Sequence, residues 1–224
     1  MVKYHLVALD IDGTLLTSKK TILSDTIKYI NEASKKGIHI VYCSGRAPAE
    51  MQDIIKLLPI IRYGVCMSGS LVYDFKEKKV IYANSISKKF VKEIIEAAKD
   101  DDGMIQFLTE NESIVREDQI THMSDFKMGI YQPMYSKIAK RVKDMNIESE
   151  NYDSIPKVNI YFHSTQARQK EHNLLDRGIE ELRYIVVNLI GHARREQLGL
   201  LFKFGLHLLG NLVGVRACYL LHHA

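Results

Sequence analysis

The sequence predicts an α/β protein built on a parallel sheet, because three short apolar segments alternate with two amphipathic ones over residues 6–67. Each apolar segment suits a strand buried on both faces, and each ends in small polar residues where the chain must turn. Strand, helix, strand, helix, strand is the order that right-handed crossovers of a parallel sheet produce. With 224 residues, of which 46% are hydrophobic and 26% charged, the chain is long enough to bury a sizeable core.

The first predicted strand is Leu6–Leu9, and the turn Asp10-Ile11-Asp12-Gly13-Thr14 comes directly after it. A helix is predicted from about Ser24, which we interpret as its N-cap, to Gly37, which occupies the position of a C-terminal glycine. Its apolar face consists of Ile27, Ile30 and Ala33.

The second predicted strand, Ile38–Cys43, stops at Ser44-Gly45-Arg46. Pro48 then suits the first turn of a second helix. The buried side of that helix is predicted to contain Met51, Ile54, Ile55 and Leu58. A third strand, Tyr63–Met67, ends at Ser68-Gly69-Ser70.

The polar residues at the three strand ends are expected to share one pocket. In open α/β sheets, ligands bind in the crevice beyond the carboxyl ends of the strands. The residues that should converge there, although far apart in the sequence, are Asp10, Asp12, Ser44, Arg46 and Ser68.

The character of the sequence changes between Tyr82 and Arg183, where strand-like and amphipathic helical segments alternate. The predicted strands there are Gly103–Leu108 and Lys157–Phe162, and the predicted helices are Ser87–Lys99 and Tyr135–Met145. We therefore expect a first part of a core domain in residues 1–81 and an inserted α+β domain in residues 82–183. Residues 184–224 form an atypical C-terminal segment that completes the core if it folds, with Tyr184–Ile190 as one strand.

The composition shifts again after about residue 183, where Leu, Gly, Arg and His replace Lys and the acids. Of the 27 acidic residues, only Glu196 lies beyond Leu182. Leu198–Leu221 is leucine-rich, but Lys203 and Arg216 interrupt it, and the uncharged stretch between them is shorter than the ~20 residues that cross a bilayer. No signal peptide is visible, so we expect a soluble, cytoplasmic protein without a membrane partner.

The net charge of +4 is mild, and Lys and Arg alternate with Asp and Glu through most of the chain. This pattern is typical of a solvated surface and excludes nucleic acid as the expected partner. The three cysteines, Cys43, Cys66 and Cys218, have neither paired nor metal-type spacing. Because Cys43 and Cys66 lie in apolar runs, we predict buried thiols in a reducing compartment.

Asp10 and Asp12 are the residues best suited to chemistry. At a strand end that is turning, their backbone and side-chain oxygens can surround one small ion, and hard oxygen ligands suit Mg²⁺. A carboxylate can attack phosphorus, and a second acid can protonate the leaving group and then activate water. An isolated Asp-x-Asp-Gly is more often a solvated turn, but the apolar strand before it and Thr14-Leu15 after it favour a site.

Ser44 and Arg46, at the end of the second strand, each allow a structural and a functional interpretation. Ser44 is either a turn or capping serine or, with free amides at a helix start, a phosphate ligand. Arg46 is either a surface arginine or a contact to substrate phosphate. Ser68 and Gly69 are adequately explained by a plain turn.

Three segments resemble one known family. Val7-Ala8-Leu9-Asp10-Ile11-Asp12-Gly13-Thr14-Leu15 resembles the first motif of the haloacid dehalogenase (HAD) superfamily, and Cys43-Ser44-Gly45-Arg46 is similar to the second motif of its Cof-type phosphatases. The segment Cys66–Asp74 resembles the stretch after the second motif in those proteins, with Ser68 where they usually carry Asn. The resemblance covers roughly residues 1–165 and implies a Rossmann-like parallel sheet core with an inserted α+β cap domain.

The resemblance also implies a function. Asp10 would be the nucleophile and Asp12 the acid/base, with Mg²⁺ held at Asp10 and Asp12. Ser44 would be a phosphate ligand. The full set of residues that we predict to bind phosphate and substrate is Thr14, Ser44, Gly45, Arg46, Ser68 and Gly69. The substrate would be a small phosphorylated metabolite, often a sugar phosphate, and the cap would close over it and select among substrates.

Two further family elements are not found in the sequence. One is a lysine, usually in Ser-Lys-Gly, and the other is a Gly-Asp-x-x-Asn-Asp motif that completes the magnesium site. Arg194 or Arg195 lies near the expected place of the lysine, although arginine differs from lysine in shape and hydration. Three hypotheses remain: an active Mg²⁺-dependent phosphatase, a truncated or frameshifted protein that binds phosphate compounds without turnover, and a related phosphomutase or phosphotransferase.

Overall fold

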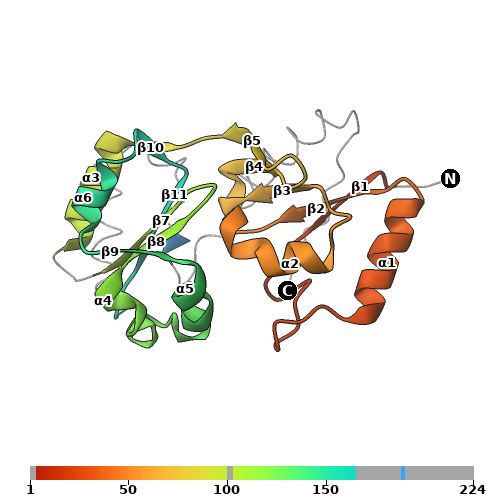
Figure 1. Ribbon diagram of the computed structural model, residues 1–224, viewed down its shortest axis with the longest axis horizontal. Coiled ribbons are helices and arrows are strands. Elements are labelled where there is room, and N and C mark those ends of the chain that lie inside the picture. The colour runs from red at the N-terminus through yellow and green to blue at the C-terminus, as the bar shows by residue number, and fades with distance from the viewer. Residues whose placement is uncertain (1–3, 100–102, 165–187, 190–224) are drawn as a thin grey trace. The chain divides into compact units, whose positions relative to one another are not determined.

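The structure, a computed structural model, describes residues 4–99, 103–164 and 188–189. They form two compact units, and the boundary between them in the sequence lies between Ala83 and Asn84 (Figure 1). Each unit has its own sheet and its own core, so the two are described separately.

The first unit contains a five-stranded sheet in the order β1-β2-β3-β4-β5. Its strands are β1 (Leu6–Leu9), β2 (His39–Cys43), β3 (Tyr63–Cys66), β4 (Leu71–Asp74) and β5 (Lys79–Ala83). β1 pairs with β2 and β2 with β3, both in parallel. The predicted α/β core with a parallel sheet is therefore confirmed, and the carboxyl ends of three strands meet at one edge.

The edge hairpin of this sheet was not predicted. β4 pairs antiparallel with β3, and β5 pairs antiparallel with β4. Asp74, at the end of β4, organises the turn between the two hairpin strands. Its Oδ1 accepts hydrogen bonds from the backbone N–H groups of Lys76 and Glu77, at 3.0 and 3.1 Å.

The two predicted helices of this unit are present, with one corrected boundary. They are α1 (Ser24–Lys35) and α2 (Gln52–Leu57), the latter preceded by the 3-10 helix η1 (Pro48–Met51). Leu23 rather than Ser24 is the N-cap of α1, and no side chain caps this end. The prediction for Gly37 is confirmed, because its φ of +81° is a left-handed conformation that glycine adopts without steric cost.

Alternation along β2 sends side chains to both faces of the sheet. Val41 and Cys43 join a buried cluster with Leu6, Val65 and Val72. Tyr42 points to the other face, where its hydroxyl donates to the carbonyl of Leu58 at 3.3 Å. Both faces of β2 are thus covered, as its continuous apolar run predicts.

The second unit contains a five-stranded sheet in the order β12-β11-β7-β8-β9 and a two-stranded sheet of β10 and β6. The strands are β6 (Ile86–Ser87), β7 (Met104–Leu108), β8 (Ser113–Arg116), β9 (Lys140–Val142), β10 (Ser154–Ile155), β11 (Lys157–Tyr161) and β12 (Asn188–Leu189). The helices of this unit are α3 (Lys88–Lys99), α4 (Glu117–Ile120), α5 (Gln132–Ile138) and α6 (Met145–Ser149). It also contains the short 3-10 helices η3 (Met123–Phe126) and η4 (Gly129–Tyr131). A further 3-10 helix, η2 (Met67–Gly69), belongs to the first unit.

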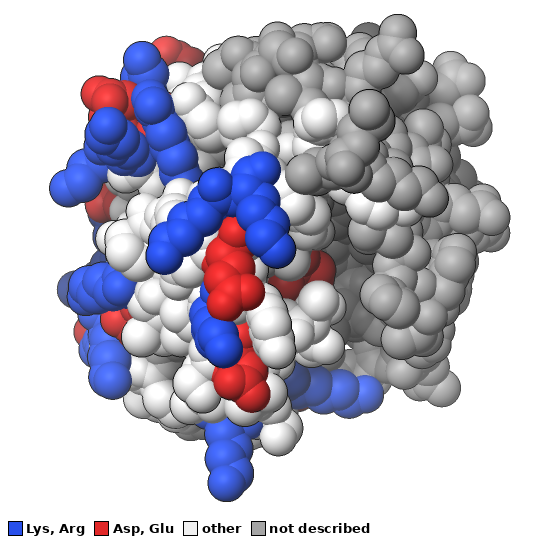
Figure 2. All heavy atoms as spheres, turned by 90° about the vertical axis from the view of Figure 1, so that its right-hand side faces the viewer, with Lys and Arg blue, Asp and Glu red and all other residues white. Residues whose placement is uncertain are grey.

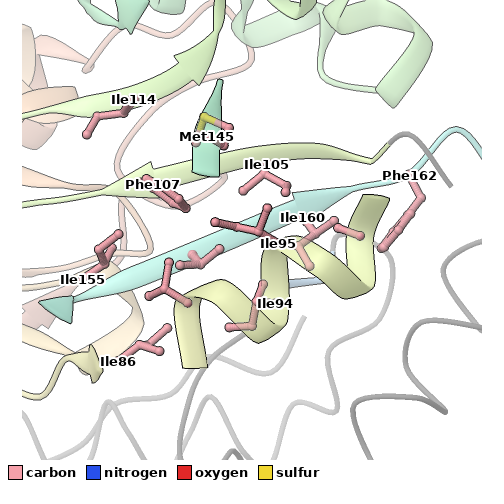
Figure 3. Close-up of a cluster of buried hydrophobic side chains, with 13 residues drawn as sticks. Ile86, Ile94, Ile95, Ile105, Phe107, Ile114, Met145, Ile155, Ile160 and Phe162 are labelled. Carbon is pink, nitrogen blue, oxygen red and sulfur yellow. The ribbon is translucent and has the colours of Figure 1, made fainter. Parts of the chain in front are cut away.

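The larger sheet of the second unit separates two apolar clusters. Figure 3 shows the cluster on the α3 side, where Ile94 and Ile95 of the helix pack with strand residues such as Ile105, Phe107 and Ile160. The second cluster contains Met104, Val115 and Tyr161, together with residues of η3 and α5. This arrangement is the α+β character that the sequence predicts for the region.

Two predictions for this region are corrected. Residues 135–145 are not one helix, because α5 ends at Ile138 and Lys140–Val142 form β9, which pairs in parallel with β8. The described part of the predicted strand Tyr184–Ile190 is Asn188–Leu189, which pairs with β11 of the second unit instead of extending the first sheet. The rest of residues 184–224, including Arg194 and Arg195, lies outside the described residues.

The surface and the thiols of the described residues agree with the sequence. Figure 2, which views the side of the molecule where α1 lies, shows acidic side chains among the lysines and arginines of the coloured part. Among the described residues, no helix is long and apolar enough to cross a membrane. Cys43 and Cys66 are buried free thiols, as predicted, whereas Cys218 lies outside the described part of the chain.

Candidate active site at the carboxyl ends of β1, β2 and β3

The turn after β1 folds tightly around Asp10. The backbone N–H of Leu15 donates to the Asp10 carbonyl at 3.2 Å, and that of Leu16 donates to the Ile11 carbonyl at 2.9 Å. Gly13 makes this turn possible with a φ of +84°. The Thr14 hydroxyl donates to Oδ2 of Asp10 at 3.0 Å and so orients the carboxylate.

Asp12 is held by two cations. Arg46 donates through Nε to Oδ2 at 2.7 Å and through Nη2 to Oδ1 at 2.8 Å. Lys20 donates through Nζ to Oδ1, also at 2.8 Å. The two-point contact from the guanidinium fixes the plane of the carboxylate as well as its position.

Arg46 is itself positioned by its neighbours beyond β2. Its Nη1 donates to the Glu50 carbonyl at 3.1 Å. Glu50 is buried, and its Oε2 accepts from the backbone N–H of Ala47 at 2.9 Å. The backbone N–H of Arg46 donates to the Ser44 hydroxyl at 3.2 Å. These hydrogen bonds direct the guanidinium at Asp12.

The turns after β2 and β3 are connected by two backbone hydrogen bonds. Ser68 N–H donates to the Ser44 carbonyl at 3.1 Å, and Met67 N–H donates to the Arg46 carbonyl at 3.0 Å. Met67, Ser68 and Gly69 have φ values of +51°, +59° and +102°. A left-handed conformation in a buried methionine and a buried serine is strained, and such strain is found most often at functional sites.

The two aspartates have opposite electrostatic environments. Although Asp10 is exposed as a residue, protein atoms crowd its carboxylate, and this loss of hydration raises its pKa against the hydrogen bond from Thr14. The charge of Asp12 adds to the increase. At Asp12, partial burial opposes ionisation, but the hydrogen bonds from Arg46 and Lys20 outweigh it, so the pKa lies below the ordinary aspartate value.

The residues expected to converge are distributed over three connected turns. Asp12 and Arg46 are in direct contact, Ser44 and Ser68 are linked through the backbone, and Thr14 contacts Asp10. The Ser44 hydroxyl is buried and accepts from the backbone N–H of Arg46 in the same turn, which agrees with the interpretation as a turn serine. Gly45 and Gly69 lie in these same turns.

Lys20 and Glu50 belong to the site but were not identified from the sequence. Lys20 is in a polar stretch with no spacing that relates it to Asp12, so no local signal marks it. Glu50 comes shortly after Ala47-Pro48, and an acid three residues after a helix start is a capping signal that could have identified it.

The oxygen atoms of Asp10 and Asp12 fit the coordination of a hard divalent cation only in part. Asp10 offers carboxylate oxygens, which suit Mg²⁺. The Asp12 carboxylate is already engaged by Arg46 and Lys20, so its main-chain carbonyl is the oxygen that remains for a metal. Among the described residues, no group of three or more His, Cys, Asp or Glu side chains lies close enough together to hold a metal ion.

A family model for haloacid dehalogenase-like hydrolases matches residues 7–188. Among curated proteins, pyridoxal phosphate phosphatase YbhA of Escherichia coli is 32% identical over 80 residues, which are 36% of this chain and 29% of that protein. The chain spans about a third of the length of the first curated relatives that it matches.

Solved structures show the same fold. A haloacid dehalogenase-like hydrolase from B. subtilis has a TM-score of 0.72 at 17% identity, over 95% of this chain and 80% of the other. A sugar phosphatase of HAD subclass IIB has a TM-score of 0.52 at 16% identity, over 94% of this chain and 99% of the other. At these identities the likeness concerns the fold.

Proposed function

The chain belongs to the haloacid dehalogenase-like hydrolase family, and on that premise we propose that it is a magnesium-dependent phosphatase of small phosphorylated metabolites. The observation that carries the proposal is the pair Asp10 and Asp12 at the end of β1. The two carboxylates have opposite pKa shifts, and that of Asp12 lies beside a guanidinium and an ammonium group. A pair of acids with different environments is suited to two different chemical roles.

In the proposed first step, a carboxylate oxygen of Asp10 attacks the phosphorus of the ester, and the bond from phosphorus to the alcohol oxygen breaks. Asp12 gives a proton to the departing alkoxide. In the second step Asp12 takes a proton from water, whose oxygen attacks the phosphoryl group, and the bond to Asp10 breaks to release inorganic phosphate. The Thr14 hydroxyl orients the Asp10 carboxylate for the attack.

The first step requires a protonated Asp12, whereas Arg46 and Lys20 favour its ionised form. We propose that the negative charge of an incoming phosphate group attracts these two cations away from Asp12. Their loss would raise the pKa of Asp12 and let it carry the proton that the leaving group needs. Arg46 would thereby contact the phosphate only when substrate is present.

Mg²⁺ would be held by the Asp10 carboxylate and the main-chain oxygen of Asp12, and when bound it would neutralise phosphate charge. Sugar phosphates and related metabolites are the proposed substrate class. Both YbhA, by its name a pyridoxal phosphate phosphatase, and the subclass IIB sugar phosphatase act on small phosphate esters. We further propose that residues 82–183 form an inserted domain that selects among such esters.

The test is hydrolysis of para-nitrophenyl phosphate with and without Mg²⁺, by the wild type, Asp10→Asn and Asp12→Asn. We expect Mg²⁺-dependent turnover that falls by at least about a thousandfold in Asp10→Asn, because the nucleophile is lost. Asp53→Asn is the matched control, since Asp53 is fully exposed on α2 and should leave turnover unchanged. Equal turnover by the wild type and Asp10→Asn would contradict the proposal.

Binding of phosphate compounds without turnover is the second candidate function. It is favoured by the engagement of Asp12 with two cations and by the lack of a third metal-binding side chain in the described part of the chain. Folded wild-type protein without Mg²⁺-dependent turnover, but with calorimetric binding of inorganic phosphate that Arg46→Ala weakens, would support it over the first.

A further inference from the structure

A cavity of about 210 Å³ lies in the second unit, between the end of α3, the start of β7, the end of β8 and the start of α6. Its apolar wall includes Ile95, Ile105 and Met145, three members of the cluster drawn in Figure 3. Since a water molecule occupies about 30 Å³ of liquid, the cavity has room for a molecule of several heavy atoms.

The polar wall of this cavity contains three cationic side chains. Lys99, Arg116 and Lys143 line it, and among the described lining residues Asp144 contributes the one carboxylate. The Asp144 carboxylate caps α6, where its Oδ1 accepts from the backbone N–H groups of Asn146 and Ile147 at 2.7 and 3.3 Å. Its charge is thus partly balanced by the helix start. Lys99 and Arg116 have acidic partners of their own, Glu96 at 3.6 Å and Asp118 at 2.7 Å, and Lys143 adds a further positive charge to the wall.

One buried amide in the wall lacks a partner. Gln119 lines the cavity, is only 4% exposed, and its Nε2 has no hydrogen-bond partner among the residues that the structure describes. An unpaired buried amide N–H costs about 1–3 kcal/mol, so native proteins rarely retain one without a ligand or water to accept from it. An oxyanion in the cavity would accept this hydrogen bond.

We propose that this cavity, the Gln119 cavity, binds a small organic oxyanion, a phosphate or carboxylate that carries a short apolar part. The oxyanion accepts from Nε2 of Gln119 and is neutralised by Lys143 and Arg116. Arg116 also donates through Nε to Asp118 at 2.7 Å, which fixes the position of the guanidinium. The apolar part contacts Ile95, Ile105 and Met145, where it is removed from water.

The residues that line this cavity all belong to the second unit, whereas Asp10 and Asp12 belong to the first. We propose an effector or a second metabolite as its ligand rather than the ester that is hydrolysed, because none of the lining residues belongs to the turns that hold Asp10 and Asp12. The test of ligand binding in this cavity does not depend on whether the protein hydrolyses phosphate esters.

The test is a titration of the full chain with butylphosphonate, which has an oxyanion head, a short apolar chain and no ester bond to hydrolyse. Nuclear magnetic resonance would monitor the Gln119 side-chain amide and the backbone amides of Gly103 and Asn146, with the Gly45 amide reporting on the first unit. Inorganic phosphate, butyrate and butanol, titrated separately, distinguish a phosphate head, a carboxylate head and the apolar part alone.

We expect saturable shifts of the Gln119, Gly103 and Asn146 signals with butylphosphonate, and none with butanol. Lys143→Gln should weaken this binding about fivefold or more, because it removes one cation from the wall. The matched control Lys137→Gln, an exposed lysine of α5, should not change it. Gln119→Leu should abolish the shifts at Gly103 and Asn146 while leaving the protein folded, since it removes the unpaired amide at nearly constant volume.

The proposal would be overturned by an absence of shifts at these three positions in folded protein. It would also be overturned if Lys143→Gln and Gln119→Leu bound butylphosphonate as tightly as the wild type. Shifts confined to Gly45 would indicate binding in the first unit alone and would equally exclude the Gln119 cavity.

Discussion

Arg46 and Asp12, 34 residues apart in the sequence, form a two-point ion pair through Nε and Nη2 of the guanidinium, at 2.7 and 2.8 Å. The pair joins the turn after β1 to the turn after β2. Burial opposes ionisation of Asp12, but this pair, together with Lys20, stabilises the carboxylate over the protonated acid and lowers its pKa. The same ion pair therefore fixes the position of the Asp12 carboxylate and favours its ionised form.

Replacement of Arg46 by alanine should raise the pKa of Asp12 toward the value of about 4 of an ordinary aspartate. A folded-state pKa below the unfolded value contributes stability that is present above the unfolded pKa and lost as the pH falls through the folded one. Arg46→Ala should thus lower the free energy of unfolding by about 1–2 kcal/mol at neutral pH, and the difference from wild type should shrink in acid. Carboxyl ¹³C titration and urea unfolding measure the two effects.

The control for that experiment is Arg141→Ala, since Arg141 is exposed in the second unit and its Nη2 donates to the carbonyl of Ser136 at 2.9 Å. It should change neither the pKa of Asp12 nor its pH dependence. An unchanged Asp12 pKa in Arg46→Ala would show that the ion pair does not hold in solution.

Replacement of Asp74 by asparagine should destabilise the first unit in neutral solution and remove part of its acid sensitivity. Burial opposes ionisation of Asp74, but hydrogen bonds from Arg62 and two backbone amides outweigh it and lower the pKa. The stabilisation is present above the unfolded pKa and lost as the pH falls through the folded pKa. At neutral pH the free energy of unfolding of Asp74→Asn should be about 2 kcal/mol below that of the wild type. The urea midpoints at neutral pH and near pH 3 should differ less in Asp74→Asn than in the wild type.

Asp53→Asn is the matched control for Asp74→Asn, because the Asp53 side chain is fully exposed. Its urea midpoints should match those of the wild type at both pH values. If Asp74→Asn behaved like Asp53→Asn, the buried carboxylate would contribute nothing to acid stability.

Gly37→Ala should lower the free energy of unfolding by about 1 kcal/mol. The φ of +81° is unfavourable for alanine, whereas a Cβ at this position would meet no atom within 4 Å, so the cost is purely conformational. Lys36→Ala, at an ordinary φ of −84°, tests the neighbouring position and should be nearly neutral. If urea unfolding gave the same free energy for Gly37→Ala as for the wild type, α1 would not end in a left-handed residue at position 37.

The thiols of Cys43 and Cys66 should not react with a disulfide reagent such as dithiobis(nitrobenzoate) in the native protein. Burial removes them from solvent and raises the pKa of both, so the reactive thiolate is scarce. In a Cys218→Ser background, both thiols should react at once in concentrated guanidinium chloride and remain unreacted without it. Rapid reaction of either thiol in the folded protein would contradict their burial.

Local patterns predicted most of the first unit. The strands at Leu6–Leu9 and Tyr63–Cys66, and the end of α1 at Gly37, result from short apolar runs and from turn residues that are adjacent in the sequence. The same kind of local signal gave a wrong prediction at Tyr135–Met145, where the spacing of apolar residues suggested one helix. β9 forms there because Lys140–Val142 pair with Ile114–Arg116, and no pattern within the segment records that partner.

Residue types and spacing by themselves determined that Asp10 and Asp12 come directly after a buried strand, and the order of elements determined that three strand ends meet at one edge. Only the tertiary structure decided that Arg46 and Lys20 are the partners of Asp12, and that Lys99, Arg116, Gln119 and Lys143 surround one cavity. The physical reason is that periodicity and turn propensity depend on near neighbours in the chain. Ion pairs, pKa shifts and cavities depend on which distant residues packing brings within a few ångströms.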